Sequence, residues 1–210
     1  AEGFTDARGR YSIDFENEGE SGYYVQVVAE NDNERIAQKV TDLDGNLYSW
    51  RTEDTYDEKE TPDNKDINIE IGKVVSGAAL NVWDVGVSCS TYARIYSGQS
   101  MPMLQFLWTD GEKPEGEDAS FFTDKNKIFV LGDPADSDCY DDVILGHEYG
   151  HFVMSVVGRD DSPGGSHSSN KQSKPTLAMS EGWATFFGVT ASGAQHIWTQ
   201  MPAVWVFITA

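Results

Sequence analysis

Basic side chains are scarce in this 210-residue sequence, which has 15 Lys and Arg against 35 Asp and Glu and a net charge of −20 at pH 7. Such a chain repels nucleic-acid phosphates and anionic lipid head groups, so we expect no nucleic-acid partner. We expect no membrane span either. Residues 182–210 carry no Asp, Glu, Lys or Arg, but glycine, glutamine and proline interrupt them.

Cysteine is equally rare. Cys89 and Cys139 are too few for a disulfide framework and too far apart for a Cys-x-x-Cys motif. They are either bridged to each other in an oxidising compartment or are two buried thiols. The chain opens without a basic and apolar leader, as a secreted protein does once its signal peptide is removed. We therefore expect a secreted or cell-surface protein.

Residues 1–75 and 76–210 differ in pattern, and together they predict an α+β protein. The first part has alternating or β-branched runs and no long helix, so we expect an accessory β-sandwich of the immunoglobulin-like kind. Its predicted strands are residues 10–15, 23–28 and 66–71, with turns at Glu18-Gly19 and Asp44-Gly45. The second part predicts helices over 78–96, 138–157 and from about 176, and strands over 104–108 and 127–131.

The sequence His147-Glu148-Tyr149-Gly150-His151 is an HExxH motif within one predicted helix. The two histidines share a helix face with Cβ atoms about 5–6 Å apart. Both imidazoles can therefore reach one zinc ion at about 2.0–2.1 Å. Glu148 is placed to take a proton from a zinc-activated water rather than to bind the metal. Because apolar residues flank the motif, these histidines need a partner, and we interpret them as metal ligands.

A catalytic zinc site takes a third protein ligand. The metzincin pattern would place a histidine six residues after His151, but that position is Val157. Glu181, on a later predicted helix, is the better candidate.

HExxH followed by Ser180-Glu181-Gly182-Trp183-Ala184 resembles the gluzincin zinc metallopeptidases over about residues 125–190. The second element is similar to the glutamate-ligand helix of aminopeptidase N-type enzymes. The spacing and the His-Glu-Tyr-x-His motif are similar to those of bacterial collagenases. The resemblance implies a zincin domain that cleaves peptides or proteins. It also implies that His147, His151 and Glu181 are zinc ligands and that Glu148 is the general base.

Two positions depart from that family's pattern. Thermolysin-like members carry an Asp four residues after the ligand Glu to orient the first histidine, and this sequence has Thr185 there. Gluzincins also supply a downstream Tyr or His to stabilise the oxyanion. No tyrosine follows Tyr149, which leaves His196 as the candidate. His167, in a Gly/Ser-rich loop, is a further candidate ligand or substrate contact.

The resemblance further implies that residues 127–131 form the edge strand on which an extended substrate pairs, which makes Phe129 a candidate substrate contact. The acidic loop over residues 110–118 is a weaker candidate for a Ca²⁺ site. A second acidic turn, residues 41–46, lacks the distal ligands of a calcium loop and is better explained as a hairpin turn.

Three functions fit these observations. The first is a secreted zinc metalloendopeptidase. The second is an aminopeptidase, although no Gly-rich exopeptidase motif precedes His147. The third is a surface or binding module with a vestigial zinc site. The apolar residues 203–210 mean either that the natural chain continues or that this end packs inside the fold.

Overall fold

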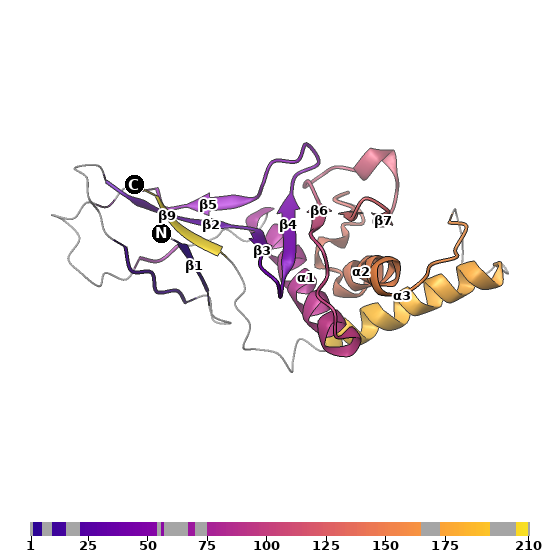
Figure 1. Ribbon diagram of the computed structural model, residues 1–210. Helices are drawn as coiled ribbons and strands as arrows, with labels where there is room; N and C mark the ends of the chain where they lie inside the picture. The colour runs from indigo at the N-terminus through magenta and orange to yellow at the C-terminus, as the bar shows by residue number, and fades with distance from the viewer. Residues whose placement is uncertain are drawn as a thin grey trace.

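The computed structural model describes residues 2–5, 10–15, 22–53, 56, 67–69, 75–164, 173–193 and 205–209. Within these residues the fold combines three α-helices with two β-sheets (Figure 1). The α+β class predicted from the sequence is thereby confirmed at this coarse level.

One sheet has four antiparallel strands in the order β1-β9-β2-β5. These strands are Glu2–Phe4, Trp205–Thr209, Tyr24–Val28 and Ser49–Arg51. β9 lies between β1 and β2, and its Thr209 pairs with Tyr24. Figure 1 shows this sheet and both chain ends on the side of the molecule away from α2 and α3. The strand predicted over 23–28 is confirmed as β2.

The second sheet has five strands in the order β3-β4-β6-β8-β7. They are Glu30–Asp32, Ala37–Thr41, Leu104–Leu107, Lys127–Phe129 and Phe121–Thr123. The three central strands are parallel, and β3 and β7 run antiparallel at the two edges. Strand pairing therefore joins residues on both sides of position 75, because β4 pairs with β6.

Helices α1 and α2 contact this sheet, and α3 packs on α2 and α1. α1 and the start of α3 lie close to the predicted positions. α1 is Val75–Ser97, α2 is Asp142–Val157 and α3 is Pro175–Gly193. Gly98 ends α1 with a φ of 71° and an N–H bond back to Arg94. Two short 3-10 helices, Pro114–Gly116 and Asp138–Tyr140, lie in the connections.

The main core lies between α1, the five-stranded sheet and α2. Its largest fully buried side chains include Trp83, Trp108, Tyr149, Phe152 and Phe187. Burial of each such aromatic side chain contributes about 1.5–3 kcal/mol, so this core is the main support of the two helices that carry the motifs.

Three local predictions differ from the structure. Residues 10–15 form no strand, although their sequence alternates. Of the strand predicted over 66–71, only residues 67–69 are described, and they form none. The helix predicted over 138–157 is divided at Asp141, whose φ and ψ are −91° and 88°. The Asp141 carboxylate accepts hydrogen bonds from the Val143 and Ile144 N–H groups, so this residue caps α2 instead of continuing a longer helix.

Cys89 and Cys139 are unbridged and buried. Burial raises the pKa of both thiols, which keeps them protonated at neutral pH. The turn at Asp44-Gly45 is confirmed, with Gly45 at a φ of 93°. The expected turn at Glu18-Gly19 lies outside the described residues. Of the helices in the described part of the chain, none has the length and apolar composition to cross a bilayer.

Candidate metal centre

Small residues let α2 and α3 approach backbone to backbone. Gly150 of α2 faces Ala184 of α3, and Gly188 of α3 faces the backbone around His147. A Cβ atom on Gly150 would lie 2.9 Å from the Ala184 Cα atom, and one on Gly188 would lie 2.7 Å from the His147 nitrogen. Neither position has room for a side chain. This contact therefore fixes the distance between the two helices that carry the motifs.

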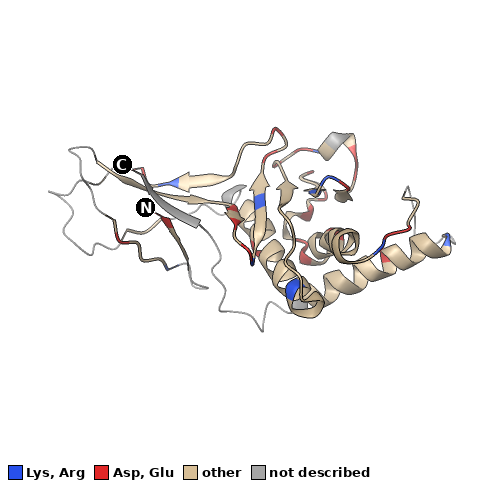
Figure 2. Cartoon of the chain, viewed as in Figure 1, with Lys and Arg blue, Asp and Glu red and all other residues tan. Residues whose placement is uncertain are grey.

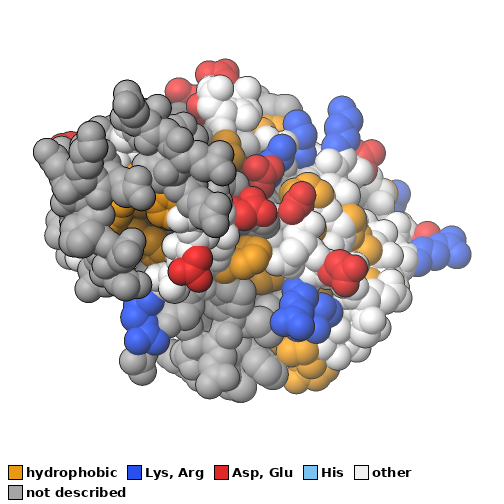
Figure 3. Space-filling model, turned by 60° about the vertical axis from the view of Figure 1, so that its left-hand side comes forward, with side chains coloured by type: hydrophobic (Ala, Val, Ile, Leu, Met, Phe, Trp, Pro, Cys, Tyr) orange, Lys and Arg blue, Asp and Glu red, His pale blue; other side chains and the backbone are white. Residues whose placement is uncertain are grey.

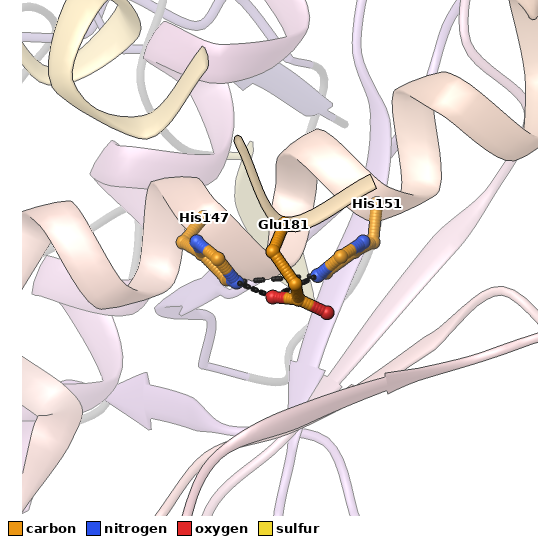
Figure 4. Close-up of side chains that lie close together, drawn as sticks. All are labelled: His147, His151 and Glu181. Atoms are coloured by element: carbon orange, nitrogen blue, oxygen red, sulfur yellow. Dashed lines mark hydrogen bonds and ion pairs between the residues drawn. The ribbon is translucent and has the colours of Figure 1, made fainter. Parts of the chain in front are cut away.

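His147 and His151 of α2 and Glu181 of α3 converge on one point, as Figure 4 shows. Glu181 Oε2 lies 3.2 Å from His147 Nε2 and 3.6 Å from His151 Nε2. The two Nε2 atoms are 3.2 Å apart. The structure thus brings together the three residues that the sequence predicted as ligands.

This donor set fits zinc. Two imidazoles and one carboxylate form a common catalytic zinc site, which leaves a fourth position for water or substrate. All the donor atoms lie within 4.8 Å of one another. No other His, Cys, Asp and Glu side chains in the described part of the chain form such a group of three. The three side chains are 22%, 15% and 21% exposed, so a ligand can reach them from solvent.

Hydroxyl groups of α3 hold the other nitrogen of each imidazole. His147 Nδ1 lies 3.2 Å from Thr185 Oγ1, and His151 Nδ1 lies 3.3 Å from Ser180 Oγ. Thr185 therefore occupies the orienting position that the sequence left open. Outer partners of this kind fix the ring orientation and the tautomer of a metal-binding histidine.

Glu148 is buried beside the histidines, with 9% of the residue exposed. Its Oε2 atom accepts a 2.8 Å hydrogen bond from the Phe122 N–H group, and its Oε1 atom lies 4.0 Å from His147 Nε2. Burial raises the pKa of Glu148 to about 8. The charges of Glu181 and Asp138 add to this rise, and the Phe122 hydrogen bond opposes it. This value applies to the metal-free protein. A cation bound beside Glu148 would lower the pKa and favour the ionised carboxylate, which is the form that accepts a proton.

The expected edge strand is wrong in one respect. β8 holds residues 127–129, but it lies between β6 and β7, so β7 forms the edge beside α2. Phe129 is 9% exposed and its ring stacks on Phe121 at a centroid distance of 5.0 Å. The edge strand on which an extended substrate could pair is therefore β7 rather than β8. The sequence did not reveal this, because a three-residue strand such as Phe121–Thr123 carries little periodicity.

His167 and His196 lie outside the described residues, so their roles stay predictions. In the acidic loop, Lys113 pairs with Asp118 and also with Asp133, at 3.0 Å. Asp42 accepts hydrogen bonds from the backbone and side chain of Asn46, which agrees with a hairpin turn. A Ca²⁺ site in the acidic loop stays a prediction.

Three residues of the site were missed by sequence reasoning or given no role there: Phe122, Ser180 and Asp160. Ser180 has a sequence signal, because it directly precedes the predicted ligand Glu181. Phe122 acts through its backbone N–H, which every residue but proline has, so its type carried no information. Asp160 lies in the segment after α2, 20 residues before Ser180 in the sequence, and only the fold brings the two side chains into contact.

Acidic residues are distributed over both sheets and the connecting loops rather than gathered at the candidate metal centre (Figure 2). On the face drawn in Figure 3, acidic and basic side chains are interspersed with apolar ones, and the described residues form no continuous basic surface there.

Comparison of the chain with protein-family models, with curated proteins and with solved structures finds no match. We therefore infer function from the sequence motifs and from the geometry of this centre.

Proposed function

We propose that this protein is a secreted zinc-dependent metalloendopeptidase. The observation that carries the proposal is the convergence of His147, His151 and Glu181 on one point, with donor atoms within 4.8 Å and with Glu148 buried alongside. Two surface histidines that share no ligand would not be expected to lie against a carboxylate from a second helix. The partial exposure of all three side chains supports a site open to substrate.

Zinc bound by these residues would supply Lewis-acid polarisation of the peptide carbonyl and of the attacking water. The chain itself supplies the proton transfer. Glu148 Oε1 takes the proton that water loses as its oxygen attacks the carbonyl carbon. The same carboxyl then gives the proton to the amide nitrogen as the C–N bond breaks, which yields an acid and an amine. The hydrogen bond from the Phe122 N–H group to Oε2 holds the Glu148 carboxyl group with its Oε1 atom toward the histidines.

Substrate binding is proposed at β7. This strand is the edge of the five-stranded sheet and lies against α2. The Phe122 N–H group points to Glu148 rather than to β8. A hydrogen bond therefore joins the outer edge of β7 to the proposed base. An extended peptide that pairs with this edge would bring its backbone past Glu148.

At the level of fold, we propose that α2, α3 and the five-stranded sheet form a gluzincin-like zincin domain. A mixed sheet, a helix that carries HExxH and a second helix that carries the glutamate ligand support this proposal. The immunoglobulin-like sandwich predicted for residues 1–75 stays a prediction, as does the division of the chain at residue 75.

The decisive experiment measures zinc content and peptide cleavage on the same preparations. Wild-type protein is expected to hold about one zinc per chain. It should also cleave internally quenched peptides whose ends are blocked. Glu148→Gln should keep the zinc and lose activity by at least about 100-fold, the usual contribution of a general base. Glu181→Ala should lose the zinc.

Three outcomes would contradict the proposal. Undiminished cleavage by Glu148→Gln would exclude the proposed base. Absence of zinc after zinc has been supplied would favour a binding module with a vestigial site. If cleavage occurs only when the substrate has a free amino terminus, the protein is an aminopeptidase instead.

A further inference from the structure

The second histidine of the motif is connected to a carboxylate through a buried serine. Ser180 Oγ lies 3.3 Å from His151 Nδ1 and donates a 2.9 Å hydrogen bond to Asp160 Oδ2. Ser180 is completely buried. Asp160 lies in the exposed segment that follows α2. The three residues thus link a loop to the imidazole at the metal centre.

The number of protons in this chain of hydrogen bonds determines its direction. An ionised carboxylate only accepts hydrogen bonds, and a serine hydroxyl has a single proton to donate. Asp160 Oδ1 already accepts from the Ser162 N–H group at 2.9 Å, and Oδ2 receives the Ser180 proton. Ser180 Oγ can then only accept from His151, so the imidazole proton resides on Nδ1.

This tautomer leaves the lone pair of His151 on Nε2. Nε2 is the nitrogen that faces the centre, 3.2 Å from His147 Nε2 and 3.6 Å from Glu181 Oε2. We propose that Asp160 is a positioning residue that holds His151 in its Nδ1–H tautomer through Ser180, and so prepares Nε2 to bind the metal. The link to metal binding rests on the proposed function, whereas the choice of tautomer does not.

Asp160→Asn tests the direction of the hydrogen bonds without a change in size. The Ser162 N–H group needs an acceptor, so the asparagine oxygen stays there and its NH₂ group faces Ser180. The serine must then accept from asparagine and donate to His151, which moves the imidazole proton to Nε2. We expect zinc affinity to fall by about 10–100-fold, the usual effect of losing an outer partner of a metal ligand.

Asp161→Asn is the matched control, because it removes the same charge one residue away. Asp161 pairs with Arg159 at the surface, at 2.8 Å, whereas the Ser180 hydroxyl donates to Asp160. Zinc affinity, measured by competition with a chromophoric chelator, should be unchanged in this variant. In the Ser180→Ala background, Asp160→Asn should have no further effect, since the link is already broken.

A second readout does not require metal. Nitrogen-15 NMR of histidine-labelled, metal-free protein at about pH 8, where ordinary imidazoles are neutral, reports the tautomer of each ring. We expect His151 as Nδ1–H in the wild type and in Asp161→Asn, and as Nε2–H in Asp160→Asn.

The inference is overturned if the wild-type ring is Nε2–H, or if Asp160→Asn leaves both the tautomer and the zinc affinity as in the wild type. The two proposals fail separately. If wild-type protein binds no zinc but the tautomer changes as expected, the positioning role of Asp160 stands and the peptidase proposal fails. If zinc binds equally well to both proteins and the tautomer is unchanged, the positioning role fails and the peptidase proposal stands.

Discussion

A Cβ atom on Gly146 would lie 2.9 Å from the Gly188 Cα atom, so these two glycines place α2 and α3 in direct backbone contact. Real Cβ atoms do not approach backbone so closely, and any larger residue at either position must push the helices apart. The candidate metal centre spans the same two helices, and its donor atoms are separated by only 3.2–3.6 Å. The geometry of the site therefore depends on residues that carry no functional group.

Gly188→Ala should impair both stability and metal binding. Overpacking of this kind costs about 1–3 kcal/mol, and the displacement of α3 moves Glu181 away from the histidines. Denaturant unfolding and zinc titration measure the two effects. Gly182→Ala, on the same helix, is the control, because a Cβ atom there meets nothing within 4 Å. It should stabilise the protein by about 0.5–1 kcal/mol, and an equal loss in both variants would contradict the packing argument.

Thr185→Val should lower zinc affinity, because it removes the hydroxyl 3.2 Å from His147 Nδ1 while keeping the side-chain shape. A loss of about tenfold is expected for this outer partner, and Thr185→Asp should raise affinity because a carboxylate is the stronger acceptor. Thr190→Val serves as control, since that hydroxyl bonds to backbone carbonyls of α3. Equal zinc affinities for Thr185→Val and wild type would show that the hydroxyl has no orienting role.

Glu148 should make the metal-free protein less stable as the pH rises. Its folded pKa of about 8 lies above the ordinary value of 4.5, so between these values the folded state binds more protons than the unfolded state. Unfolding free energy then falls with increasing pH in this window, by a few kcal/mol at about 1.4 kcal/mol per pKa unit. Urea unfolding in a chelator at pH 5 and pH 8.5 measures this loss.

The glutamine side chain of Glu148→Gln cannot ionise, so this variant should not show the loss of unfolding free energy that Glu148 causes as the pH rises. Its stability relative to wild type should therefore increase between pH 5 and pH 8.5, even though other groups titrate in both proteins. A constant difference between the two proteins would mean that Glu148 is ionised throughout the range.

Asp141→Ala should destabilise the start of α2 by about 1 kcal/mol, because it removes the acceptor for two N–H groups of the first turn. Asp141→Asn keeps an acceptor oxygen and should restore most of the loss. Thermal unfolding of the three proteins checks the order. An Asn variant as unstable as the Ala variant would indicate that charge, rather than capping, is the stabilising factor.

Local pattern predicted the helical part of this protein well. The helix over residues 78–96 and the strands near 104 and 127 follow from periodicity and from glycine at Gly98, and the i, i+4 spacing placed His147 and His151 on one face. Glu181 was reached through the resemblance of its helix to a known motif. These features depend on residues that are close in sequence.

Features that depend on distant residues were missed. Residues 10–15 alternate like a strand but form none in the described structure. β7 forms one edge of the five-stranded sheet, and Phe122 contacts Glu148 through its backbone N–H group, which does not depend on the residue type. The break before α2 has a local cause, because the Asp141 carboxylate accepts hydrogen bonds from the first N–H groups of α2, although the periodicity of the sequence continues through this residue.

The position of β9 between β1 and β2 has a consequence during synthesis. Residues 24–28 leave the ribosome early, but the strand that covers one of their edges, Trp205–Thr209, is made after all three helices. Until then β2 exposes an unpaired edge of the kind that pairs with other chains. Closing so long a loop is also slow, because its entropy is lost before any pairing is gained. The nascent chain is therefore most open to aggregation while its helical part is already able to fold.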